Sequence, residues 1–467
     1  MNVSKKKKIS KSSPLNVHFI GIGGIGMSGL ARYFLAHTWQ VSGSDAAMGI
    51  MTQELLKDGV NVKIGHKKGN ISVDTRLVIY NRAIPPDNQE LQAALADKNI
   101  ITLPYSQALG RITEDYQTIA ITGSHGKSTT TALAGVTLMR SGLDPTILVG
   151  TKLVDLAGKN IRVGHGPYLV LEADDFHAAF LDYSPAISIV TNIDREHMDF
   201  YKTFANVKRA FLKFLSRTRA GGTLILNQDD APLYSLRPAI AQLAKKNNLK
   251  VLWFSVDVGA NALLARKIKK IIPISGAHNI SNAMAAVQLG KLLKIPEKKI
   301  LSAIGSYKGA WRRMELKGKL KGTKNFVYDD YAHHPTEIRA TLAAFREKYP
   351  TSPLVCIFQP HQAKRLELLF KDFTEAFDTA DIIFILPLYT VLGRDEKFLH
   401  DSEALVKALI ARSPEKPVFY LSQPKKIKAA IETVLRDVPL KKHFTRSPVI
   451  VMMGAGDISD LTEKLLQ

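Results

Sequence analysis

The chain has 467 residues, of which 45% are apolar, and a formal net charge of +22 at pH 7. This length corresponds to roughly three domains of about 150 residues, with enough apolar residues for several cores. The single cysteine, Cys356, excludes a disulfide framework and fits a reducing compartment. No apolar run reaches the roughly 18 residues of a membrane-spanning helix, and no signal-peptide core follows the four lysines at positions 5–8. We therefore expect a cytoplasmic protein without membrane insertion, with a basic flexible tail over residues 1–13.

The positive charge alone is compatible with nucleic acid, an anionic membrane surface or polyanionic small molecules as partners. The lysines are spread over local clusters, however, and the sequence contains neither a nucleic-acid fold signature nor a basic strip with interleaved aromatic residues. A solvated basic surface is the favoured interpretation, and no nucleic-acid partner is expected.

Short β-branched runs alternate with helical stretches along almost the whole chain, which predicts an α/β protein built on parallel sheets. The first block, 14–113, has predicted strands at 17–20, 41–44 and 77–80, with helices ending at 36 and covering 89–96. The second block, 114–307, has strands at 118–121, 168–173, 187–192 and 223–226 and helices at 278–292 and 297–306. The third block, 308–467, has strands at 325–330, 354–358, 382–386 and 449–453 and a helix at 336–349.

A glycine-rich turn joins the first predicted strand to the first helix, with glycines at positions 21, 23, 24 and 26. Asp45 follows Gly26 by 19 residues, at the end of the second strand. Glycines allow a backbone to approach a diphosphate, and an acidic group at that strand end can bond a ribose hydroxyl. A dinucleotide and a nucleotide sugar both offer these groups, and a plain packing turn is the third interpretation, so this spacing leaves the ligand open.

The most informative motif is Gly123-Ser124-His125-Gly126-Lys127-Ser128-Thr129-Thr130, which follows the apolar run 118–121 and opens a helix. Backbone N–H groups of such a turn point at phosphate oxygens, the lysine reaches the outer phosphates, and the serine hydroxyl is placed to bind Mg2+. The motif is shorter than the common phosphate loop, because Ile121 stands where that loop has glycine. A structural glycine turn with an exposed lysine does not explain this context, so we predict a nucleoside triphosphate site.

Two further polar groups follow predicted strands. Glu172 lies near the end of a buried-looking strand, where parallel sheets present ligand-binding groups, and its carboxylate suits a metal. His197 stands among carboxylates after the next strand and is a candidate ligand either for a second divalent ion or for the first, although a lone histidine is more often structural.

Together these motifs resemble the Mur ligase family, the ATP-dependent amino acid ligases of peptidoglycan precursor synthesis. The resemblance spans nearly the whole chain. It is carried by residues 18–29, 42–45, 83–85, 123–130, 172–174, 191–193 with 197–199, 276–282, 311–315, 329–335, 358–361 and 454–457.

The resemblance implies three domains: a Rossmann-like N-terminal domain for a UDP-sugar, a central ATPase-like domain for Mg-ATP, and a Rossmann-like C-terminal domain for the amino acid. It implies ligation of L-alanine to the lactyl carboxylate of UDP-N-acetylmuramate through an acyl phosphate, with two Mg2+ ions and Lys127, Glu172 and His197 as catalytic residues. The implied ATP-binding residues are Gly123, Ser124, His125, Gly126, Lys127, Ser128, Thr129, Asn279, Arg313 and Asp330. The implied UDP-sugar-binding residues are Gly21, Gly23, Gly24, Gly26, Met27, Ser28, Ser44 and Asp45. His334, His361 and Arg365 are implied to bind the amino acid, and Ser128, Glu172 and His197 to bind the metal ions.

The chain departs from the family pattern at three places. Gln362 and Ala363 stand where the family usually has an arginine and an aromatic residue, which bears on how the amino acid carboxylate is held. The stretch 251–276 is shorter than the family's, and Phe176-His177 is unusual after the acidic motif at 172–175. Two alternative functions stay open: a recycling ligase that joins a preformed peptide to the same UDP-sugar, and a nucleotide-sugar-binding protein without catalysis. The sequence does not distinguish a monomer from a homodimer.

Overall fold

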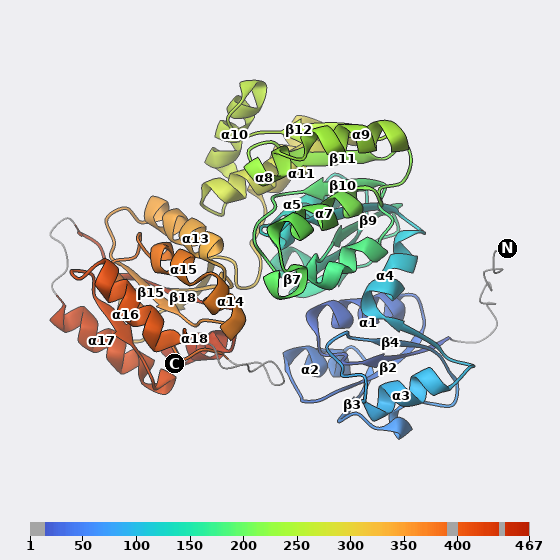
Figure 1. Ribbon diagram of the computed structural model, residues 1–467, viewed down its shortest axis with the longest axis horizontal. Coiled ribbons are helices and arrows are strands. Elements are labelled where there is room, and N and C mark those ends of the chain that lie inside the picture. Colours follow the sequence, from blue (N-terminus) through green and yellow to red (C-terminus); the bar gives the residue numbers. More distant parts are fainter. Residues whose placement is uncertain (1–14, 390–399, 439–443, 467) are drawn as a thin grey trace.

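The computed structural model describes residues 15–389, 400–438 and 444–466, and it consists of three α/β units that follow one another along the chain (Figure 1). The strands of each sheet come from one predicted block, so the α/β class with three sheet-based domains is confirmed. The exact boundaries at 113 and 307 stay predictions, and the predicted tail 1–13 lies outside the described residues.

The first unit is a five-stranded sheet of order β3-β2-β1-β4-β5 in which all neighbours are parallel. Its strands are β1 Asn16–Ile20, β2 Gln40–Asp45, β3 Asn61–Ile64, β4 Thr75–Tyr80 and β5 Ile101–Pro104, and its helices are α1 Ile25–Ala36, α2 Ile50–Lys57, α3 Gln89–Ala96 and α4 Tyr105–Thr113. A short 3-10 helix, Lys68–Asn70, precedes β4. This order places the glycine turn after β1 at the centre of the sheet, where open parallel sheets bind ligands.

The second unit is a seven-stranded sheet of order β12-β11-β10-β6-β9-β7-β8. Its strands are β6 Gln117–Thr122, β7 Thr146–Leu153, β8 Lys159–Arg162, β9 Tyr168–Glu172, β10 Ile187–Val190, β11 Thr223–Asn227 and β12 Lys250–Phe254. Its helices are α5 Lys127–Arg140, α6 Met198–Tyr201, α7 Phe204–Leu215, α8 Ala231–Tyr234, α9 Arg237–Asn247, α10 Gly259–Ile271, α11 Ala277–Leu292 and α12 Glu297–Gly305, with 3-10 helices at Val154–Leu156 and Phe176–Asp182. The edge strand β8 runs antiparallel to β7, which departs from the purely parallel sheet expected from the sequence.

The third unit is a six-stranded sheet of order β13-β14-β18-β15-β16-β17, and its edge strand β13 is antiparallel to β14. Its strands are β13 Glu315–Lys319, β14 Phe326–Asp330, β15 Leu354–Phe358, β16 Ile382–Ile385, β17 Val418–Tyr420 and β18 Val449–Met453. Its helices are α13 Pro335–Lys348, α14 Ala363–Leu368, α15 Phe370–Ala376, α16 Ser402–Arg412, α17 Ile427–Asp437 and α18 Ile458–Leu466, with a 3-10 helix at Pro424–Lys426.

Helix α5 is the structural centre of the second unit. Residues 128–138 are all buried, although five of them are serine or threonine, because α5 lies between the sheet and helices α11 and α12. A helix fixed on all sides keeps its N-terminus in one place, which a phosphate-binding turn requires.

Polar contacts join the first unit to the second. The Arg32 guanidinium in α1 is 6% exposed and donates to Asn160 Oδ1 in β8 at 3.1 Å. Asn160 in turn donates from Nδ2 to the Ile25 carbonyl at the start of α1, at 2.5 Å. The N-terminus of α1 is thereby fixed against the central sheet.

Within the described ranges, every helix is too short or too polar to cross a lipid bilayer.

Candidate active site

The glycine motif after β6 forms a tight loop that only glycine permits at two positions. Gly123 has φ 145° and Gly126 φ 80°, and a Cβ atom at either would collide, with the Thr191 hydroxyl and the Asn282 side chain respectively. Asn192 holds the loop from β10: its Oδ1 accepts from His125 N at 2.8 Å, and its carbonyl accepts from Ser124 N at 3.2 Å. The loop therefore presents its free N–H groups and the N-terminus of α5 in a fixed arrangement suited to phosphate.

Lys127, the first residue of α5, is held at the mouth of this loop. Its Nζ donates to the Gly123 carbonyl at 2.7 Å and the Ser124 carbonyl at 3.1 Å, and it pairs with Asp175 Oδ1 at 2.8 Å. Burial opposes the charge on Lys127, but the carboxylates of Asp175 and Asp174 outweigh it and raise the pKa of the ammonium. The lysine is thus a fixed positive charge beside the loop.

Ser128 and Glu172, which the sequence predicted as metal ligands, meet at the ends of α5 and β9. Ser128 Oγ donates to Glu172 Oε1 at 3.0 Å, and the Gly150 N–H donates to Glu172 Oε2 at 2.7 Å. Burial raises the pKa of Glu172. A carboxylate and a hydroxyl beside a phosphate loop are the oxygen ligands that Mg2+ prefers, so these residues fit a nucleotide-bound Mg2+.

His197 lies near a second group of metal-ligand atoms. One ligand atom each from Asp174, Asp175 and His197 lies within 4.8 Å of the others. Asp175 is fully buried, and its Oδ2 finds no hydrogen-bond partner among the described residues. His197, the N-cap residue of α6, has a left-handed backbone with φ 53°. This group also fits a divalent cation.

These residues line a cavity of about 720 Å3 to which all three units contribute. The first unit supplies Gly24, Gly26, Met27 and residues 81–83; the second supplies Ser124, Lys127, Ser128, Glu172, Asp174, Glu196 and His197; the third supplies residues 311–313, Tyr331, His333, His361, Gln362 and Arg365. A cavity that three units share changes shape when any one of them moves, so its chemistry depends on their relative positions.

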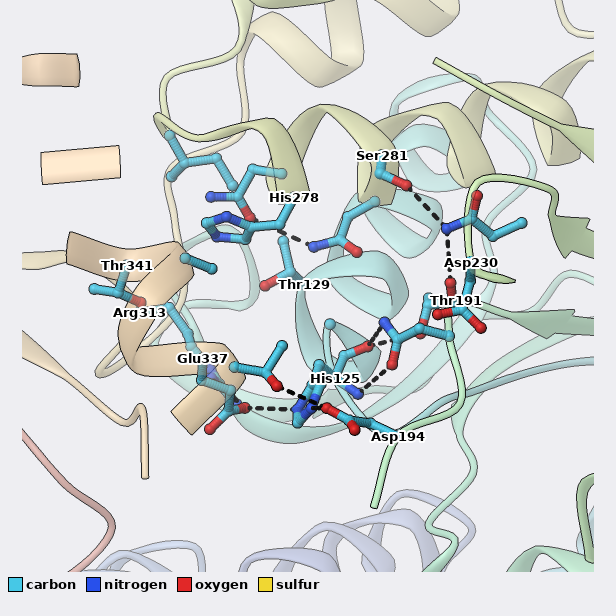
Figure 2. A pocket seen from close by; sticks show the side chains of 18 of the residues that line it. His125, Thr129, Thr191, Asp194, Asp230, His278, Ser281, Arg313, Glu337 and Thr341 are labelled. Carbon is cyan, nitrogen blue, oxygen red and sulfur yellow. Dashed lines mark hydrogen bonds and ion pairs between the residues drawn. The ribbon is translucent and has the colours of Figure 1, made fainter. Parts of the chain in front are cut away.

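A second cavity, of about 480 Å3, lies on the other side of the phosphate loop between the second and third units (Figure 2). His278 and Asn279 at the start of α11, Arg313, and Asp330 at the end of β14 line it together with His125, Gly126 and Thr129. Burial lowers the pKa of His278 to about 4, so its ring is neutral at pH 7. Gly126 and Arg313 line both cavities, so a molecule that occupies the two would pass over the loop.

His125 of the loop connects the second unit to the third. Its Nε2 contacts Asp194 Oδ2 at 2.9 Å and its Nδ1 lies 3.6 Å from Glu337 Oε1 in α13, and Figure 2 shows both contacts. Thr336 Oγ1 also donates to Asp194 Oδ2, at 2.7 Å. Burial would lower the pKa of His125, but its hydrogen bond to Asp194 and the nearby Glu337 carboxylate outweigh this and raise the pKa to about 9. The imidazolium is charged at pH 7 and stabilises the contact between these units.

Only two of the three predicted amino-acid-binding residues line a cavity. His361 and Arg365 line the larger cavity, and the ring of His361 stacks on Tyr389. His334 is 3% exposed and is not among the residues lining either cavity; its Nδ1 accepts from Thr336 N at 3.3 Å and caps α13. Its Nε2 has no hydrogen-bond partner among the described residues, and a ring nitrogen of His334 lies within 4.8 Å of ligand atoms of His125 and Glu196, so its contact with the amino acid stays a prediction.

The predicted UDP-sugar-binding residues likewise line the larger cavity only in part. Gly24, Gly26 and Met27 line the larger cavity, whereas Gly21, Gly23, Ser28, Ser44 and Asp45 do not. Asp45 Oδ2 accepts from Gly23 N at 2.8 Å, so this carboxylate fixes the glycine turn. Ser28 and Ser44 are fully buried; Ser28 Oγ donates to the Ile25 carbonyl and Ser44 Oγ donates to Glu90 at 2.7 Å. Their side chains have no surface on which to meet a ligand in this structure.

Several site residues were not predicted from the sequence, among them the acidic residues Asp175, Asp194, Glu196 and Glu337. Glu196 directly precedes the predicted His197, and Asp175 follows the predicted Glu172 by three residues, which was the available signal, but acidic residues are also common on surfaces. The unusual His177 has a left-handed backbone, lines the larger cavity and stacks on Phe200 at 4.8 Å.

A loop shaped for phosphate, with a lysine, a hydroxyl and a carboxylate around it, defines a nucleotide-dependent enzyme, and the shared cavity places its other substrates among three domains. Comparison with known proteins supports this class of enzyme over most of the chain. Three family models match: "Mur ligase family, catalytic domain" over residues 16–117, "Mur ligase middle domain" over 121–290, and "Mur ligase, glutamate ligase domain" over 312–456.

The chain is 37% identical over 462 residues to the UDP-N-acetylmuramate--L-alanine ligase of Desulfatibacillum aliphaticivorans, covering 97% of this chain and 98% of that protein. It is 34% identical to the same enzyme of Aquifex aeolicus, covering 96% and 97%. The crystal structure of a UDP-N-acetylmuramate-alanine ligase from Thermotoga maritima shares the fold, with a TM-score of 0.74, 24% identity and 97% and 98% coverage. A murein peptide ligase from Psychrobacter arcticus has a TM-score of 0.66 at 21% identity, with the same coverage. The chain belongs to the Mur ligase family and is an ATP-dependent ligase.

Proposed function

We propose that this enzyme joins L-alanine to the lactyl carboxylate of UDP-N-acetylmuramate, with cleavage of ATP to ADP and phosphate, in peptidoglycan precursor synthesis. The names of the relatives at 34–37% identity support the substrates. The observation that carries the chemistry is the position of Lys127, Ser128 and Glu172 on one wall of a cavity whose other walls come from the first and third units.

The proposed reaction has two steps, and this arrangement is compatible with both. The carboxylate oxygen attacks the γ-phosphorus of ATP, so that an acyl phosphate forms and ADP leaves. The alanine ammonium loses a proton, the resulting amine attacks the acyl carbon, and the tetrahedral intermediate loses a second proton from nitrogen and expels inorganic phosphate as the amide forms. Lys127 and the N-terminus of α5 stabilise the negative charge on the transferring phosphoryl group.

The lining of the two cavities supports a separate place for each substrate. ATP would occupy the smaller cavity, with its base near His278 and Asn279 and its phosphates over the loop into the larger one. The UDP-sugar would lie against Gly24 and Gly26 of the first unit, and the amino acid near His361 and Arg365 of the third. Ser128, Glu172 and His197 would hold two Mg2+ ions, which neutralise phosphate charge when bound. We place the reaction in the cytoplasm, where ATP and nucleotide sugars are available.

The test is incubation of the purified protein with Mg-ATP, UDP-N-acetylmuramate and single amino acids or a tripeptide, with phosphate release and product mass as readouts. The expected result is phosphate release with an alanyl adduct, both lost in Lys127→Ala. An adduct with the tripeptide alone would support the recycling ligase instead. Binding of the UDP-sugar without turnover of any acceptor would support the binding protein. An adduct only with another amino acid would point to the altered residues Gln362 and Ala363.

A further inference from the structure

A buried ion pair between two units lies on the wall of the larger cavity. Glu196, in the loop before α6, and Arg365, in α14, approach to 3.3 Å between Oε2 and the Nη2 group. Their side chains are 4% and 8% exposed. Because Glu196 belongs to the second unit and Arg365 to the third, this pair exists only while the two units are close.

The contact between them is weak for a buried pair. A single guanidinium nitrogen faces Glu196 at the upper end of hydrogen-bond distances, and the other terminal nitrogen donates to the His361 carbonyl at 3.4 Å. A bidentate pair would be shorter and stronger. Glu196 Oε2 also accepts from the His197 backbone N–H at 3.2 Å, and a ring nitrogen of His334 lies within 4.8 Å of the carboxylate, whereas His197 Nδ1 and His333 Nε2 lie at 3.9 Å. Each of the two charges therefore retains capacity for a better partner.

We propose that Glu196 determines specificity for a free α-amino acid, which inserts between Glu196 and Arg365 with its α-ammonium on Glu196 and its α-carboxylate on Arg365. This inference rests on the proposed function. It adds a carboxylate that binds the ammonium group of the amino acid, whereas the sequence predicted only histidine and arginine side chains for the amino acid site. One ion pair is exchanged for two, so neither buried charge is left without a counter-charge.

The exchange explains selectivity by the cost of leaving a buried charge unpaired. A hydroxy acid such as L-lactate satisfies Arg365 but brings no positive charge to Glu196, and an amino acid amide fails at Arg365 in the opposite way. A site built for a charged partner rejects the analogue that lacks it more strongly than a hydrophobic pocket rejects a change in size. The zwitterion alone satisfies both residues.

The experiment uses Glu196→Gln in the full-length enzyme, with Glu375→Gln as the matched control. Glu375 is the carboxylate of an exposed pair with Arg412 at 3.7 Å, with the two side chains 41% and 40% exposed, so its loss should change no kinetic constant. Three quantities are measured: the KM for L-alanine, the inhibition constant of L-lactate, and acyl phosphate formed without amino acid and trapped by borohydride reduction.

In Glu196→Gln we expect the KM for L-alanine to rise about 10- to 100-fold, as for loss of a charged hydrogen bond. The L-lactate inhibition constant should change less than about threefold, since lactate does not use the carboxylate, and the trapped acyl phosphate should form at the wild-type rate. Glu196→Asp, which keeps the charge, should have an intermediate KM and decides the matter if the Gln variant fails to fold.

An unchanged KM for L-alanine in both variants would overturn the inference. So would a loss of acyl phosphate in Glu196→Gln, because Glu196 would then act on the first step through its neighbour His197. Absence of acyl phosphate in the wild-type enzyme would instead refute the proposed function itself.

Discussion

Lys127 has two roles that one substitution cannot separate. It neutralises phosphate in the proposed reaction, and it is the counter-ion of Asp175, which is fully buried. Lys127→Met removes the ammonium and leaves the Asp175 carboxylate in a buried site without a cation. Removal of one partner of a buried ion pair costs about 3–5 kcal/mol. Because Lys127 retains 16% exposure, we take the lower end, about 3 kcal/mol, as the expected loss in the free energy of unfolding.

Addition of Asp175→Asn to Lys127→Met removes the unpaired charge. The double variant should regain at least about 2 kcal/mol of that loss, since a neutral amide at the site is much less costly than an uncompensated carboxylate. Its activity should stay at least about 1,000-fold below wild type, because the positive charge at the transferring phosphoryl group is still missing.

Urea unfolding followed by tryptophan fluorescence measures the stability, and Trp253 in β12 reports on the second unit. Phosphate release measures the activity. The reasoning is refuted if Lys127→Met is as stable as wild type, or if the double variant regains activity along with stability.

Three further predictions concern the loop and the contacts between units. Gly126→Ala places a Cβ at φ 80° against Asn282; it should abolish saturable ATP binding in calorimetry while the UDP-sugar still binds, and normal ATP affinity would contradict the loop geometry. The pKa of His125, raised from 6.5 to about 9, contributes stability that is fully present below pH 6.5 and lost as the pH rises through about 9. The free energy of unfolding should fall by up to about 3 kcal/mol over that range, and less in Asp194→Asn; equal pH profiles would show that the Asp194 contact does not stabilise the charged ring. Asn160→Ala takes the acceptor from the buried Nη1 of Arg32 and removes one of the side-chain donors to the Ile25 carbonyl, so it should lower stability by about 1–3 kcal/mol and raise the KM for the UDP-sugar, while an unchanged KM would mean that α1 keeps its position without Asn160.

The sequence predicted the elements whose local pattern and burial agree. Strands β6, β15 and β18 are short β-branched runs buried on both faces, and the structure has them within a residue or two of the predicted bounds. The strands that were not predicted are β3, β5, β7, β8, β12, β13 and β17. For β3 and β8 the reason is local, because Asn61–Ile64 is largely exposed and Lys159–Arg162 is half polar. Both lie at sheet edges, where pairing with a neighbour rather than an apolar pattern makes the strand.

The site residues also fall into those that have a local sequence signal and those that do not. The phosphate loop, Glu172 and His197 carry signals in the local sequence, namely glycine spacing and position after a strand. Glu196 and Asp194 acquire their partners, Arg365 and Thr336, only when the third unit packs on the second, across about 140–170 residues of chain. Ser44, which the family resemblance implied as a UDP-sugar-binding residue, is a different case: its hydroxyl donates to Glu90 inside the protein, and a contact with the sugar stays a prediction.

The central claim is that the lactyl carboxylate is activated by transfer of a phosphoryl group from ATP within the cavity that the three units share. The most direct test uses UDP-N-acetylmuramate with both oxygens of that carboxylate labelled with 18O, incubated with Mg-ATP and L-alanine. The account predicts one 18O atom in each inorganic phosphate released, together with the alanyl adduct and ADP. Unlabelled phosphate accompanied by amide formation would contradict it, because the carboxylate oxygen would then never have been bonded to phosphorus.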